Sequence, residues 1–279
     1  MGQVTFWSNN IGQAGTTSNT AAVASIIGLE YEIRSLITQT HFNGSYLESS
    51  FLRSKEKKLG TMYDYSDTGI DALERLIRSQ RLTPESVRNN TISLERNRLD
   101  LLLGTMKQNE ELYDGLSKVI QDIFHTAGQY YHSVLVDLHH GNKNMITNAL
   151  LESSDLVVVN LSQNMNQLEQ FFEKEDWPAA LDNKKMIIVL GHYDPKSKYT
   201  ITNIKRHFKV QVPMFAVPYC SSFKDACNDK DILGWFIKNQ NINKKHPNYY
   251  FMSEVRKIAK AVLDEVGVNT QLKNIERGA

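Results

Sequence analysis

Short apolar segments alternate along this chain with longer stretches in which apolar residues recur at helical spacing. Several of these segments, such as 134–136 and 157–159, are continuous runs of Val and Leu rather than strict alternations of apolar and polar residues. Such runs are typical of strands that are buried on both faces of a parallel sheet. The sequence therefore predicts an α/β fold, with a mostly parallel twisted sheet and helices on both of its faces.

The element pattern continues along the chain without a long linker, so we expect a single domain over residues 1–279. Strands are predicted at 3–7, 34–38, 98–103, 133–138, 156–161, 185–190 and 214–217. Helices are predicted at 21–32, 69–81, 110–126, 164–173, 201–208 and 253–266. The polar segments 53–67 and 82–95 are predicted as loops, with a helix start at 83–85.

Composition excludes several classes of protein. The formal net charge is only +1, and no Lys/Arg cluster stands out, so the sequence carries no strong nucleic-acid signal. It has neither a secretory signal nor an apolar run long enough to span a membrane. Cys220 and Cys227 are too few for a disulfide framework or a zinc site. These features predict a soluble cytoplasmic protein without an intrinsic membrane segment.

The segment 7–19, Trp-Ser-Asn-Asn-Ile-Gly-Gln-Ala-Gly-Thr-Thr-Ser-Asn, joins the first predicted strand to a helix start rich in small residues. A strand, a glycine turn and a helix N-terminus together form an anion site. The residues expected to cradle phosphate are Gly12, Gln13, Ala14, Gly15, Thr16, Thr17 and Ser18. A working P-loop carries Lys at the position of Thr16, whereas Thr17 keeps a hydroxyl for Mg²⁺. The alternative is an ordinary strand-to-helix turn that uses the two glycines for its tight geometry.

Three further strand ends carry polar or turn residues. Asp137 ends a buried strand and is expected either to hold Mg²⁺ through water or to cap the next helix. The adjacent His139 and His140 are expected to point to opposite faces, which argues against a shared metal ion. The loop 191–200 is expected to grip a base or ribose, to cap the following helix, or both. The loop 221–231 follows the strand end at 216–220 and is expected at the same crevice, although its composition also suits plain solvation.

In their order, these motifs resemble the deviant Walker ATPases of the ParA/MinD type, over about residues 3–265. The segment 189–199, Val-Leu-Gly-His-Tyr-Asp-Pro-Lys-Ser-Lys-Tyr, is similar to a segment of the TadZ/CpaE branch of tight-adherence (Flp) pilus assembly proteins. The resemblance implies a P-loop NTPase fold that binds ATP or ADP with Mg²⁺. It places Mg²⁺ at Thr17 and Asp137, His192 where the family has its adenine-reading Asn, and Pro218 beside the base.

The departures from the family pattern all fall in the expected nucleotide crevice. The family's two loop lysines correspond to Ile11 and Thr16, and its Asp-x-Asp after the second strand corresponds to Gln39 and His41. Lysine and metal together neutralise the charge of a transferring phosphoryl group. We therefore expect hydrolysis to be weak or absent, and no residue is assigned as catalytic.

The resemblance implies a localisation or assembly factor for a pilus or secretion system, acting as a homodimer. Partners would recruit it to the inner face of the cell membrane. The receiver-like domain common in this branch is not expected, because the first predicted strand begins at residue 3. Two alternatives stay open: an active ParA/MinD-type ATPase that positions DNA or the division site, and a nucleotide-free scaffold.

Overall fold

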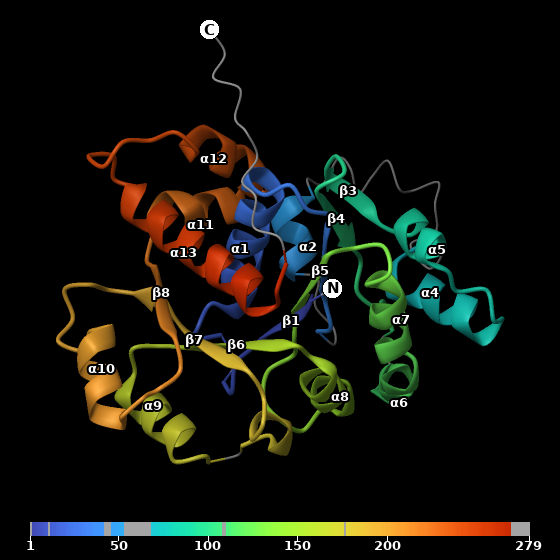
Figure 1. Ribbon diagram of the computed structural model, residues 1–279, viewed down its shortest axis with the longest axis horizontal. Coiled ribbons are helices and arrows are strands. Elements are labelled where there is room, and N and C mark those ends of the chain that lie inside the picture. Colours follow the sequence, from blue (N-terminus) through green and yellow to red (C-terminus); the bar gives the residue numbers. More distant parts are fainter. Residues whose placement is uncertain are drawn as a thin grey trace, which may run out of the picture.

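A computed structural model describes residues 2–10, 12–41, 46–52, 68–107, 110–175 and 177–268. Within them, eight strands form one sheet in the order β3-β4-β2-β5-β1-β6-β7-β8 (Figure 1). Every neighbouring pair is parallel except β3 and β4, which pair antiparallel at one edge. The predicted fold class, a mostly parallel sheet covered by helices, is confirmed.

The elements have the following bounds. The strands are β1 (Gly2–Trp7), β2 (Ser35–Gln39), β3 (Ile92–Glu95), β4 (Leu99–Leu102), β5 (Ser133–Asp137), β6 (Leu156–Leu161), β7 (Met186–Tyr193) and β8 (Met214–Pro218). The helices are α1 (Thr16–Glu30), α2 (Tyr46–Phe51), α4 (Gly69–Arg78), α5 (Pro84–Asn89), α6 (Glu110–Asp114), α7 (Ile120–Ala127), α8 (Met145–Ser153), α9 (Met165–Phe172), α10 (Ile201–Phe208), α11 (Ser221–Asn228), α12 (Ile232–Asn239) and α13 (Tyr249–Glu265), with 3-10 helices at Gly115–Lys118 and Ala179–Leu181.

The sheet separates two hydrophobic clusters, which explains the continuous apolar runs. In β6, Val158 belongs to one cluster while Val157 and Val159 belong to the other. Helices α1, α2, α11, α12 and α13 cover the first face, and α7, α8, α9 and α10 cover the second (Figure 1). Burial on both faces leaves few polar side chains in the strand centres, so Gln39 and Asp137 lie at strand ends.

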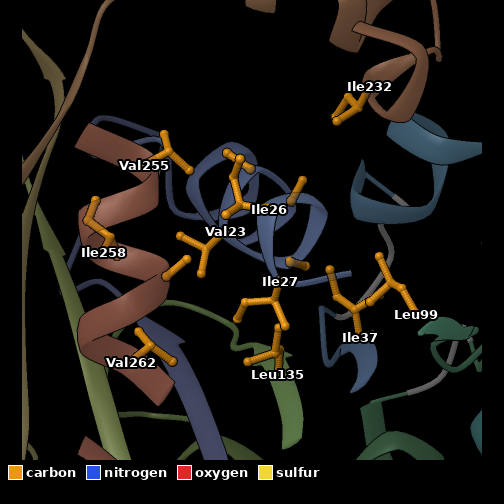
Figure 2. Packing of buried hydrophobic residues seen from close by; sticks show 14 of the residues in the cluster. Val23, Ile26, Ile27, Ile37, Leu99, Leu135, Ile232, Val255, Ile258 and Val262 are labelled. Atoms are coloured by element: carbon orange, nitrogen blue, oxygen red, sulfur yellow. The ribbon is translucent and has the colours of Figure 1, made fainter. Parts of the chain in front are cut away.

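Helix α1 lies at the centre of the first cluster. Figure 2 shows the α1 side chains Val23, Ile26 and Ile27 between α13 and the sheet. The labelled neighbours are Val255, Ile258 and Val262 of α13 and Leu135 of β5. All its residues from Asn19 to Leu29 are buried. Because α1 is enclosed on nearly every side, its first turn is held in a defined position relative to the strand ends.

Several predicted boundaries were wrong. Helix α1 begins at Thr16 rather than at residue 21, and the single helix predicted at 110–126 is divided into α6, a 3-10 turn and α7. Strand β3 lies in the segment 82–95 that was predicted as a loop, although the helix start at 83–85 is confirmed by α5. The segment 221–231 is mostly helical, and α8 and α12 were not predicted. The predicted loop 53–67 lies outside the described residues.

None of the described helices combines the length and the apolar character that crossing a bilayer requires.

Candidate functional site

The carboxyl ends of the central strands meet in front of the N-terminus of α1. Strand β1 pairs with β5 so that Phe6 lies level with Asp137, and β2 pairs with β5 so that Gln39 lies level with the same residue. Gly15 has φ 63° and ψ 33°, a left-handed conformation that turns the chain into α1. No side chain caps α1, and the first-turn N–H groups of a helix have no intrahelical acceptor. The positive end of the helix dipole therefore faces this crevice, as an anion site requires.

Buried amide side chains hold the loop before α1 in place. The Asn19 side chain donates to the Ala14 carbonyl at 3.1 Å and to Asn160 Oδ1 at 2.8 Å. Asn160 lies in β6, is fully buried, and also donates to the Val158 carbonyl at 3.0 Å. The sequence interpretation missed this pair, although an Asn within the apolar run of β6 was the available signal.

Strand β7 packs closely against the same loop. A Cβ atom on Gly191 would lie 1.8 Å from the Ala14 carbonyl oxygen, so only glycine fits there. The next residue, His192, has φ 50° and lies within an irregularity in the pairing of β7 with β8, between Leu190 and Tyr193. Its Nε2 lies 2.9 Å from where a Cβ on Gly15 would stand. The structure therefore brings His192 against the loop.

The crevice contains a cavity of about 580 Å³. Its lining residues are Ser8, Asn10, Gly12, Gly15, Thr16, Thr17, Ser18, His41, Ser49, Ser50, Leu138, His139, His140, Cys227 and Asn228. Helix α11 supplies Cys227 and Asn228, so the segment 221–231 reaches the cavity, although as a helix. The lining contributed by the described residues includes no Lys, Arg, Asp or Glu. A space of this size beside a helix N-terminus, with hydroxyl, amide and imidazole side chains among its lining residues, suits a phosphate-bearing small molecule.

Asp137 lies beneath this cavity and not on its surface. The side chain is fully buried, and its Oδ2 lies 3.0 Å from Nε2 of His41, which is 17% exposed and lines the cavity. Burial lowers the pKa of His41, but the charge and hydrogen bond of Asp137 outweigh that effect and raise it. Asp137 Oδ1 is buried and has no hydrogen-bond partner among the described residues.

His139 and His140 do not point to opposite faces, so that prediction was wrong. Their ring centroids lie 4.1 Å apart with a tilt of 31°, and both residues line the cavity. The prediction assumed that strand geometry continues past Asp137, but β5 ends at that residue. A turn follows, and its Gly141 carbonyl accepts a hydrogen bond of 2.9 Å from Trp7 Nε1. Burial and the neighbouring imidazoles lower the pKa of His140 to about 4.

The remaining predicted residues do not line the cavity. Gln13 is exposed and accepts a hydrogen bond from Gln167, while Ala14 is buried beneath Gly191. Pro218 is buried at the end of β8, opposite Tyr193, and is not among the cavity-lining residues. Ile11, which corresponds to the family's signature lysine, lies outside the described residues. The structure thus places Gly12, Gly15, Thr16, Thr17 and Ser18 together at one cavity, with Gln13 and Pro218 away from it.

No protein-family profile and no curated protein sequence matches this chain. Solved structures do resemble it. A ParA family ATPase from Chlorobium tepidum TLS has a TM-score of 0.71 at 15% identity, over 93% of this chain and 98% of that one. MinD from Pyrococcus furiosus has a TM-score of 0.67 at 13% identity, over 95% and 99%. MinD complexed with Mg-ADP from Pyrococcus horikoshii OT3 has a TM-score of 0.67 at 13% identity, over 94% and 96%.

These structures match nearly the whole chain, and the sheet order, the glycine loop and the buried α1 agree with that match. At such low identity the likeness establishes architecture rather than activity. The chain has the fold of the ParA/MinD-type P-loop NTPases.

Proposed function

We propose that this chain binds the phosphate groups of ATP or ADP in the cavity before α1 and hydrolyses nucleotide weakly or not at all. The observation that carries the proposal is the cavity itself. It joins the uncapped first turn of α1 to the hydroxyl groups of Thr16, Thr17 and Ser18, and no acidic side chain of the described residues lines it. The solved MinD complexed with Mg-ADP supports nucleotide as the ligand class.

Weak turnover follows from the groups that surround the cavity. No Lys or Arg of the described chain lines it, so no fixed cation stabilises charge on a transferring phosphoryl group. Gln39 is buried, and its side chain accepts a hydrogen bond from the Leu47 N–H at 3.4 Å. His41 is paired with Asp137, so neither position presents a free carboxylate to an attacking water.

The assignment is tested by putting a lysine back into the loop. Thr16 is the first residue of α1 and lines the cavity, so Thr16→Lys adds a cation at the helix N-terminus, beside the bound phosphates. We expect ADP to bind about tenfold more tightly to Thr16→Lys, because a charge-assisted hydrogen bond contributes about 1.5–3 kcal/mol before desolvation costs. ATP turnover should stay low in both proteins. Isothermal calorimetry and a phosphate-release assay measure the two quantities.

Gln13→Lys is the matched control, because it adds the same charge on an exposed side chain that does not line the cavity. It should change ADP affinity by less than about threefold. Equal gains in both variants would show general charge attraction instead of a phosphate site. Rapid turnover by the unmodified chain would support the active ATPase, and no binding by any variant would support the nucleotide-free scaffold.

For the cellular role, we propose a homodimeric localisation or assembly factor of the TadZ/CpaE type. Support comes from the segment 189–199, in which Gly191 and His192 contact the phosphate loop, combined with the weak catalysis proposed above. Such a factor requires a stable nucleotide-bound shape more than it requires turnover.

Affinity purification of the tagged chain from its native cells tests this role. We expect enrichment of components of a tight-adherence pilus secretion system, and a weaker enrichment with Gly191→Ala, which disturbs the loop. Selective recovery of DNA-partition or cell-division proteins instead would contradict the assembly role. The solved MinC:MinD complex from Aquifex aeolicus shows that a protein of this fold pairs with a division partner, so that outcome is a real competitor.

A further inference from the structure

Asp137, whose carboxylate is bonded to a cavity-lining side chain, is itself shielded from the cavity. Asp137 has no exposed surface, and its Oδ2 is joined to the imidazole of His41, which itself lines the cavity. His41 therefore stands between the carboxylate and any ligand in the cavity. A magnesium ion beside bound phosphates would meet the imidazole before it met Asp137.

The second carboxylate oxygen of Asp137 cannot coordinate a magnesium ion in the cavity either. Oδ1 has almost no accessible surface and no hydrogen-bond partner in the described part of the chain. Mg²⁺ requires octahedral oxygen ligands at about 2.0–2.1 Å and usually keeps several waters. A buried oxygen without access to the cavity cannot hold one of those waters.

The other side chains that line the cavity do not replace Asp137 as a magnesium ligand. Beside the hydroxyl of Thr17, the lining of described residues offers imidazoles, amides and further hydroxyls but no carboxylate. Imidazole nitrogen suits zinc or copper rather than magnesium. Among the described residues, no three His, Cys, Asp or Glu side chains are placed to hold a metal ion such as zinc. The donor set therefore does not fit the divalent cation that the fold implies.

We infer that the cavity binds phosphate groups without a divalent cation, and that Asp137 serves as a positioning residue for the His41 imidazole. This inference rests on the proposed nucleotide binding. Phosphate oxygens would be held by the first-turn N–H groups of α1 and by the hydroxyls of Thr16 and Thr17, whereas the Ser18 hydroxyl donates to the Gly15 carbonyl at 2.9 Å. Thr17 then acts as a direct hydrogen-bond donor and not as a metal ligand.

The direct test compares ADP and ATP binding to the full chain by calorimetry in buffer with magnesium chloride and in buffer with EDTA. We expect the two dissociation constants to agree within about threefold. Binding that appears only with magnesium would overturn this inference and leave the proposed function standing. Absence of binding in both buffers would overturn the proposed function, and this inference with it.

Thr17→Val is the companion variant, since it removes the hydroxyl and nearly conserves side-chain volume. It should weaken ADP binding by the same factor in both buffers. A loss seen only with magnesium would assign the hydroxyl to a metal ion and contradict the inference.

A measurement without nucleotide provides an independent readout. His41→Asp places a second carboxylate beside Asp137, and like charges at that distance repel unless a cation joins them. We expect magnesium to raise the thermal unfolding midpoint of His41→Asp and to leave that of the unmodified chain unchanged. An equal rise in both proteins would show that the native site already holds the ion. If His41→Asp does not fold, the two binding experiments decide the question.

Discussion

Gly191→Ala is expected to destabilise the protein by about 3 kcal/mol or more and to abolish ADP binding. The added Cβ would lie 1.8 Å from the Ala14 carbonyl oxygen. Neither the loop nor the strand can move away easily. The Ala14 carbonyl accepts a hydrogen bond from the Asn19 amide, and β7 is paired with β6 and β8. The clash therefore deforms the phosphate loop or displaces the end of β7. Urea unfolding and ADP calorimetry on the same preparations measure the two effects.

Gly115→Ala is the matched control. Its added Cβ would meet no atom within 4 Å, so its unfolding free energy should stay within about 0.5 kcal/mol of the unmodified chain. ADP affinity should be unchanged in that control. If Gly191→Ala kept both stability and ADP binding, the contact of β7 with the loop would not determine the shape of the site.

His41→Leu is expected to lower the unfolding free energy by about 3 kcal/mol at neutral pH. The substitution leaves Asp137 fully buried, with neither oxygen hydrogen-bonded to a side chain of the described residues. Removing one partner of a buried pair leaves an uncompensated charge, and this costs more than the pair itself contributes. Urea unfolding at neutral pH measures the change. A loss below about 0.5 kcal/mol would show that another group compensates the buried charge of Asp137.

The variant Asp137→Asn serves as the control and reveals the pH dependence of the pair. In the folded state burial lowers the pKa of His41, but the charge and hydrogen bond of Asp137 have the larger combined effect. His41 therefore has a pKa raised above its usual value. Its stabilising contribution is therefore complete below the unfolded pKa of about 6.5 and is lost as pH rises through the folded pKa. The stability advantage of the unmodified chain over Asp137→Asn should shrink as pH rises above about 6.5. A constant difference would contradict the ion pair.

The strand pattern was predictable because both faces of this sheet are buried. All seven predicted strands are present, within a residue or two at most of their ends, and β7 alone runs three residues further, to Tyr193. That extension carries Gly191 and His192, whose conformation depends on contact with the loop and on a pairing irregularity, not on local preference. Strand β3 was missed because its half-buried edge position leaves no continuous apolar run.

The site was predictable only where one segment forms it alone. The glycine loop and the first turn of α1 are consecutive in sequence, so their role as an anion cradle follows from residue types and spacing. The helix start predicted within 7–19 agrees with the start of α1 at Thr16, although the helical stretch itself was predicted only from residue 21. Thr and Ser are weak helix formers, and tertiary burial of the helix overrides that weakness. The orientation of the neighbouring His139 and His140 rings was mispredicted because the strand ends before them.

The sequence by itself determined the layered α/β fold and the position of the phosphate loop, because burial on two faces and a glycine turn both leave local patterns. Only the tertiary structure decided which polar groups meet around that loop. Asn160, Gly191 and the His41–Asp137 pair come from four different parts of the chain, and strand order and register bring them together. Contacts between residues so far apart depend on the packing of the whole sheet, which no local pattern encodes.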